Sequence, residues 1–168
     1  DHDHGRAGSG KCGCHGEVQG MKLSDHFTLA EFTRSDTAAR LGIDNTPTRH
    51  HLANLHVLAA KLEEVRALFG CPIIITSGYR SPALNAAVDG SATSSHCEGL
   101  AADFHVPAFG PDQAVAQAIA DSALEFDQLI FEQARTTWVH LGVGDRMRRD
   151  VLSWRSGRGY QRGIVRIA

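Results

Sequence analysis

The chain has 168 residues, with 17 Lys and Arg against 19 Asp and Glu and a formal net charge of −2. This length is typical of one domain with a real hydrophobic core. The nearly balanced charge creates no overall field that would attract nucleic acid or an anionic membrane. No stretch approaches the roughly 20 apolar residues of a membrane-spanning helix. We therefore expect one globular domain, a monomer, that binds neither nucleic acid nor membrane.

The first 20 residues differ in composition from the rest of the chain. They are rich in Gly and His and lack apolar periodicity, whereas Met21 begins the readable part. DHDH and CGCH have metal-ligand side chains, but neither has the spacing of a zinc finger. A basic start followed by an apolar segment, as in an export signal, is missing. We predict a flexible extension over 1–20, a single domain over 21–168, and synthesis in the cytoplasm without a signal peptide.

Two helices are indicated early in the chain. Thr28 followed by Glu31 fits a capping box, which predicts a short helix beginning near Leu29. After Pro47, apolar residues recur every three or four positions until Gly70, which suits a helix C-cap. We expect this second helix to be the longest and its apolar stripe to face the core. The stripe consists of Leu52, Leu55, Leu58, Leu62, Val65 and Leu68.

The middle of the chain alternates strand and helix signals. A β-branched run predicts a buried strand over 73–76, followed by a turn and a helix that begins at Ser81 and Pro82. Residues 101–106 are a second strand candidate. Residues 111–123 have a helical composition.

The last third of the chain is dominated by strand signals. FDQLIFE and TWVHLGV are two apolar runs joined by a short polar segment, so we predict neighbouring antiparallel strands. SGRG between VLSW and YQRGIVRI predicts a terminal hairpin at the sheet edge. Together these elements indicate a single α+β domain with a mostly antiparallel sheet and helices packed on one side.

One short segment carries most of the chemistry. SSHCEGLAADF, residues 94–104, places His96 and Asp103 on either side of a glycine in a small, apolar run. Catalytic zinc sites use three protein ligands, commonly His and carboxylate, and leave the fourth position to water. In WVHLGV, strand alternation puts His140 on the same face as Trp138 and offers the third ligand. We predict that His96, Asp103 and His140 bind one zinc ion.

Two further charged residues complete a hydrolytic site. The water at such a site needs a base, and Glu132 at the end of FDQLIFE suits that task. Arg80 in SGYRS, directly after a buried strand, is the candidate cation for a substrate carboxylate or an oxyanion. An ion pair that positions the turn is the alternative for Arg80.

The motifs SGYRS, SSHCEGLAADF, FDQLIFE and WVH together resemble the zinc D-alanyl-D-alanine carboxypeptidase and L-alanyl-D-glutamate peptidase family, peptidase M15. The resemblance runs from FTLAEF to WVHLGV. It implies a hedgehog-like and DD-peptidase-like fold, zinc ligands His96, Asp103 and His140, and Arg80 and Ser94 facing the substrate. The hedgehog signalling domain is similar in the motifs that correspond to SSHCEGLAADF and FDQLIFE, which favours Glu132 as the residue beside the zinc.

The chain departs from the family pattern at one position. Several members have a catalytic acid three residues before the last ligand, where this chain has Thr137. Asp127 is therefore kept as a weaker alternative to Glu132 for the base. Cys97, next to His96, is left out of the site because free cysteines are usually buried packing residues.

The sequence thus predicts a zinc metallopeptidase of peptidoglycan stem peptides. Both a D-Ala-D-Ala carboxypeptidase and an L-Ala-D-Glu endopeptidase remain open. The resemblance to phage-type members implies an endolysin that acts on the cell wall after release. The alternative is a zinc-stabilised module that binds peptides or cell wall without turnover. The presence of Thr137, where several family members have a catalytic acid, favours this alternative.

Overall fold

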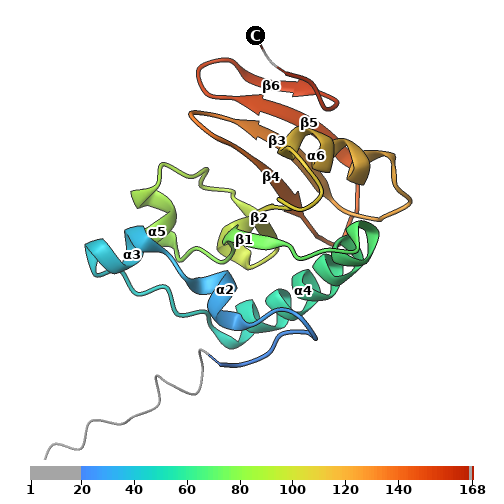
Figure 1. The fold of residues 1–168 in the computed structure, drawn as a ribbon. Helices are drawn as coiled ribbons and strands as arrows, with labels where there is room; N and C mark the ends of the chain where they lie inside the picture. Colours follow the sequence, from blue (N-terminus) through green and yellow to red (C-terminus); the bar gives the residue numbers. More distant parts are fainter. Residues whose placement is uncertain (1–19, 167) are drawn as a thin grey trace, which may run out of the picture.

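The computed structural model describes residues 20–166 and 168, so the predicted extension lies outside the described residues except for Gly20. A six-stranded sheet with the order β1-β2-β4-β3-β5-β6 forms its centre (Figure 1). Every neighbouring pair is antiparallel except β3 and β5, which are parallel. This confirms the α+β class and the mostly antiparallel sheet. The strands are β1 (Ile74–Ser77), β2 (Ala101–His105), β3 (Gln128–Gln133), β4 (Thr137–Gly142), β5 (Asp150–Arg155) and β6 (Gly159–Arg162).

The helices begin and end at the capping signals of the sequence. Thr28 donates from its backbone N–H and its hydroxyl to Glu31 Oε2, at 2.7 and 2.8 Å, at the start of the first helix. Gly70, with a φ of 64°, ends the longest helix as predicted. Ser81 caps the helix that follows β1. The helices are α2 (Leu29–Thr33), α3 (Asp36–Leu41), α4 (Arg49–Phe69), α5 (Pro82–Ala87), the 3₁₀ helix η1 (Ser95–Glu98) and α6 (Asp112–Asp121).

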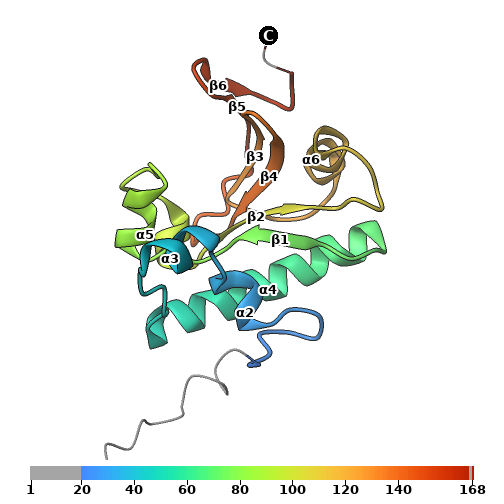
Figure 2. The ribbon, with the colours of Figure 1, turned by 60° about the vertical axis from the view of Figure 1, so that its left-hand side comes forward.

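One face of the sheet packs against α4 and α6, and the apolar core lies between them. In Figure 2, α4 runs beneath β1 while α6 lies beside β3 and β4. Leu52 is only half-buried and Leu68 is 44% exposed, so the apolar stripe of α4 is narrower than predicted. Full burial of one leucine side chain stabilises the fold by about 1.5–3 kcal/mol. Side chains buried in this core include Leu55, Leu58, Leu62 and Val65 from α4, Val115 and Ile119 from α6, and Phe104, Leu129, Phe131 and Val139 from the strands.

Two features of the fold go beyond the sequence prediction. The connection from β1 to β2 contains α5 and η1, and η1 brings His96 to the cavity on the face opposite the core, so the helical layer on one side consists mainly of α4 and α6. The predicted terminal hairpin exists as β5 and β6, but β5 joins the sheet by pairing in parallel with β3.

In residues 20–166, no helix is both long enough and apolar enough to cross a membrane.

Candidate metal centre and active site

Three side chains from three elements converge on one point of the face opposite the core. Asp103 of β2 lies directly across the antiparallel pair from His140 of β4, and η1 brings His96 to both. Asp103 Oδ1 is 3.2 Å from His96 Nε2 and 2.9 Å from His140 Nδ1, and the two nitrogens are 3.2 Å apart. All three side chains are buried. The structure therefore brings the three predicted metal ligands together.

The short η1 segment makes this convergence possible. Ser94 accepts a hydrogen bond from the backbone N–H of His96, and Gly99 ends the turn with a φ of 73°. A Cβ at Gly99 would also lie 3.1 Å from the carbonyl oxygen of His51. Because glycine tolerates both the positive φ and the close approach, the chain reverses at once and enters β2. The tight reversal explains the short spacing between His96 and Asp103.

The ring of His96 is held in one orientation by a backbone carbonyl. Its Nδ1 is 2.7 Å from the carbonyl oxygen of Gly78, which only accepts, so Nδ1 donates and Nε2 is free of its proton. Gly78 has no room for a side chain, because a Cβ there would lie 2.6 Å from the carbonyl oxygen of Phe32. The sequence analysis missed this role of Gly78. Its only signal was the glycine of SGYRS.

The donor set fits a divalent metal ion. Tetrahedral zinc with bonds of about 2.0–2.1 Å separates its ligands by roughly 3.4 Å, close to the distances between these three atoms. Burial lowers the pKa of His96, which favours the neutral form that binds metals. Burial alone raises the pKa of Asp103, but His96 and His140 outweigh it and hold the pKa below its usual range. The triad can thus hold one metal ion.

Glu132 reaches the triad from the neighbouring strand. It faces Trp138 in the β3–β4 register, and its Oε1 lies 4.0 Å from His140 Nδ1. Burial, followed by the negative charge of Asp103, raises the pKa of Glu132 to about 7. A carboxyl group with this pKa accepts and returns protons near neutral pH. A cation in the triad would lower this pKa again.

The two other positions considered for an acid are engaged elsewhere. Asp127 accepts hydrogen bonds from Arg148 Nε and Nη2, each at 2.7 Å, through both of its carboxylate oxygens. The hydroxyl of Thr137 donates to Asp112 Oδ2 at 2.6 Å, and Asp112 also contacts His105. Among the three positions, Glu132 is the one that the structure places next to the triad.

Arg80 forms an ion pair at the edge of the triad. Its Nη2 is 3.4 Å from Asp103 Oδ2 and its Nη1 donates to Asn85 Oδ1 at 3.3 Å, whereas its Nε is buried without a hydrogen-bond partner. Asn85 was missed by the sequence analysis. A Cβ at Gly90 would lie 2.1 Å from Asn85 Oδ1, so a glycine is needed for Asn85 to reach Arg80. Arg80 is therefore an ion-pair partner of Asp103 that also lines the site.

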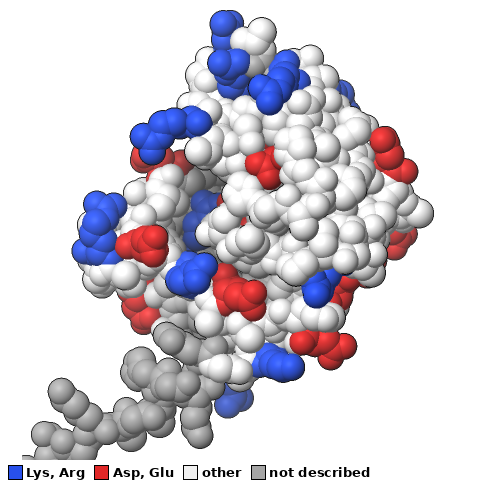
Figure 3. All heavy atoms as spheres, viewed as in Figure 1, with Lys and Arg blue, Asp and Glu red and all other residues white. Residues whose placement is uncertain are grey.

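A cavity of about 700 Å³ opens above the triad. Ser94 and Arg80 line it, as do Trp138, Trp154 and Tyr160. Figure 3 shows the hollow on this face, with basic and acidic side chains around it. Trp138 shares this cavity with His140, in line with the predicted alternation, and its buried Nε1 lies close enough to the Glu132 carboxyl group to offset part of the rise in the pKa of Glu132. Cys97 is half-buried and is not part of the candidate metal cluster.

A sheet that presents a buried His2Asp cluster beside a carboxyl group of raised pKa, at the floor of an open cavity, defines a metal-dependent hydrolase. The family model described as Peptidase M15 matches residues 25–142, which include every residue of this cluster. Because the match spans well over half of the chain, the protein belongs to the peptidase M15 family and is a metallopeptidase. No curated protein sequence matches the chain at a significant level.

Proposed function

We propose that the protein is a zinc peptidase that hydrolyses peptide bonds in peptidoglycan stem peptides, of the lytic type that phages and prophages use. The observation that carries the proposal is the convergence of His96, Asp103 and His140 with Glu132 beside them. Family membership supports a peptide substrate, and the motifs shared with D-alanyl-D-alanine carboxypeptidases support stem peptides. We further propose that the protein acts as a monomer on the cell wall after release.

Each residue has a defined task in this proposal. His96, Asp103 and His140 would hold zinc, which when bound supplies Lewis acidity and lowers the pKa of water. Glu132 accepts the proton of the attacking water at a carboxylate oxygen and then donates it to the leaving amine. Gly78 keeps Nε2 of His96 turned toward Asp103 and His140, with which it would hold the metal.

Substrate orientation falls to the residues around the cavity. Arg80 offers its positive charge to a carbonyl or carboxylate oxygen of the peptide. Ser94 lines the same cavity next to His96 and adds a hydroxyl. Trp138, Trp154 and Tyr160, which line the same cavity, provide apolar contact area.

Mass spectrometry of purified stem peptides, incubated with zinc-loaded protein and with a chelated control, tests the proposal. Zinc-dependent loss of the terminal alanine identifies a carboxypeptidase. A cut between L-Ala and D-Glu identifies an endopeptidase. If neither zinc-dependent product forms, the peptidoglycan proposal is wrong.

The assignment of the base is tested by a matched pair of variants. Glu132→Gln should lower turnover about 10²–10⁴-fold while zinc content stays the same, because the amide cannot accept the proton. Asp127→Asn should retain turnover, because Asp127 is held by Arg148. Full activity of Glu132→Gln would contradict the role of Glu132.

A further inference from the structure

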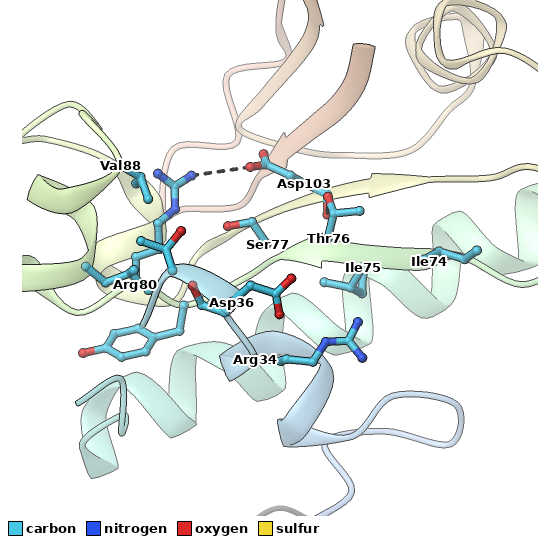
Figure 4. A pocket seen from close by; sticks show the side chains of 13 residues that line it. Arg34, Asp36, Ile74, Ile75, Thr76, Ser77, Arg80, Val88 and Asp103 are labelled. Atoms are coloured by element: carbon cyan, nitrogen blue, oxygen red, sulfur yellow. Dashed lines mark hydrogen bonds and ion pairs between the residues drawn. The ribbon is translucent and has the colours of Figure 1, made fainter. Parts of the chain in front are cut away.

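A second cavity lies on the other side of Arg80 and Asp103. Its volume is about 550 Å³, and the whole of β1 forms one wall (Figure 4). Asp103, Arg80 and Val88 border both cavities, so the second one continues from the metal centre. The proposed function assigns no task to this second cavity.

The wall formed by β1 is a sheet edge. The strand order leaves β1 with one partner strand, β2. Just beyond β1 the backbone N–H of Tyr79 donates to the carbonyl oxygen of Phe32 in α2, so in the described part of the chain the edge without a strand partner is limited to Ile74–Ser77. Ile74 is 50% exposed. Edge strands with free N–H and C=O groups bind extended peptides by adding a strand. Four residues of β1 span about 13 Å, which is enough for roughly four residues of a peptide.

One end of this edge meets the metal centre. Ser77, the last residue of β1, pairs in register with Asp103. A peptide that runs along β1 therefore has one end at the triad and extends away from it toward Ile74. This direction places the paired segment on one side of the bond that is cleaved at the triad.

The opposite wall carries two charges that lack partners within residues 20–166. Arg34 lies between α2 and α3 and Asp36 is the first residue of α3, and both reach toward β1 in Figure 4. Neither side chain has a hydrogen bond or an ion pair in that part of the chain, and both residues are exposed. An arginine pairs with a carboxylate, and an aspartate pairs with an ammonium group.

We propose that the groove along β1 is a substrate subsite for an extended peptide segment of about four residues on one side of the cleaved bond. The segment pairs its main chain with β1. Its carboxylate binds Arg34 and its ammonium group binds Asp36. The inference rests on the proposed function only in that the cleaved bond lies at the triad.

Strand pairing is tested by single N-methylations along an uncleavable stem peptide, whose scissile amide is replaced by a reduced bond. Calorimetric titration of the zinc-loaded protein measures the Kd of each peptide. Adjacent residues of a strand point their N–H groups in opposite directions, so we expect methylation to raise the Kd about tenfold at every second residue. A uniform effect, or none, would overturn the subsite.

The charged contacts are tested with Arg34→Gln and its matched control Arg40→Gln, because Arg40 is an exposed arginine of α3 that does not line the groove. Arg34→Gln should raise the Kd of the carboxylate-bearing peptide about threefold to tenfold and leave that of its amidated form unchanged. Asp36→Asn should act in the same way on the ammonium-bearing peptide compared with its acetylated form. Equal effects of the two arginine variants would contradict the contact.

The two proposals fail in different ways. If stem peptides are cleaved in a zinc-dependent manner but the methylation series is flat, the subsite is wrong and the proposed function stands. If the alternating pattern appears without cleavage of any stem peptide, the subsite stands and the proposed function fails.

Discussion

One face of β2 and β4 packs in the hydrophobic core and the other forms the candidate metal centre, although both faces belong to the same backbone. Phe104 and Val139 face the core and are fully buried among apolar side chains. Asp103 and His140, their immediate neighbours, face the other side and hold the metal centre. Because strand side chains alternate, one register serves both faces, and a slip by one residue would place the ligands in the core. Folding and metal binding should therefore be separable by substitutions one residue apart.

The two faces also differ energetically. The core face stabilises the domain through burial of apolar surface by α4 and α6. On the site face, His96 and Asp103 are buried, which costs free energy for any charged form that lacks a partner. The stability of the domain should come mainly from the first face and its chemistry from the second.

The largest effect is expected from Asp103→Asn on the site face. Loss of the negative ligand should abolish zinc binding and lower peptidase activity at least about a thousandfold, while the fold persists because the shape is retained. Zinc content, circular dichroism and turnover measure these outcomes. Asp121→Asn on α6, outside the metal cluster, is the control. Normal zinc content in Asp103→Asn would show that the ion binds elsewhere.

The neighbouring substitution Phe104→Ala should act on stability instead. Truncating a fully buried phenylalanine removes about 3–5 kcal/mol from the free energy of unfolding, which denaturant titration measures. The protein that remains folded should still bind one zinc ion. Val57→Ala, at a position of α4 that is 57% exposed, should cost less than about 1 kcal/mol. Loss of zinc binding without loss of stability in Phe104→Ala would contradict the assignment of stability to the core face and of metal binding to the site face.

A weaker effect is expected at the carbonyl that orients His96. Gly78→Ala introduces a Cβ into the space of the Phe32 carbonyl, so the Gly78 carbonyl must move away from Nδ1 of His96. We expect zinc affinity to fall about 10–100-fold, as measured by competition with a chelator. Gly144→Ala, whose Cβ would meet only ordinary contacts beside Asp127, should leave the affinity unchanged. Unaltered affinity in Gly78→Ala would mean that the ring needs no such support.

The smallest effect concerns the ion pair of Asp127 with Arg148, away from the triad. The hydrogen bonds from Arg148 lower the pKa of Asp127 below its usual value. A lowered folded-state pKa adds stability above the unfolded-state pKa of about 3.9 and loses it as the pH falls through the folded-state pKa. Asp127→Asn should therefore lower the Tm by about 3 °C or less at pH 7. The difference in Tm between the variant and the unmodified protein should disappear once the pH falls below the folded-state pKa of Asp127. A difference that grows toward low pH would contradict this sign.

The sequence predicted those features of the fold and of the site that local signals or ordered motifs determine. Thr28 and Glu31 mark the start of α2 within four residues, and the strand pair β3–β4 is a local hairpin. The ligands His96, Asp103 and His140 were found because their motif combines ligand chemistry with strand alternation. These features need no knowledge of remote packing.

The remaining features depend on contacts between distant segments. The support of His96 by Gly78 depends on how closely Phe32 approaches, and the engagement of Thr137 depends on Asp112 at the start of α6. The parallel pairing of β5 with β3 is likewise set by the tertiary arrangement. No spacing in the sequence encodes such contacts, so the structure was needed to separate Glu132 from the other candidate acids.

Whether the His96, Asp103 and His140 triad is the zinc site for peptide cleavage is tested by titrating the metal-free protein with zinc while recording the rate of stem-peptide cleavage. We expect no cleavage without zinc, a rise in the rate that is complete at one equivalent of zinc per chain, and no response from Asp103→Asn. Cleavage that is equally fast in the presence of a chelator, or a full response of Asp103→Asn, would contradict this assignment of the zinc site.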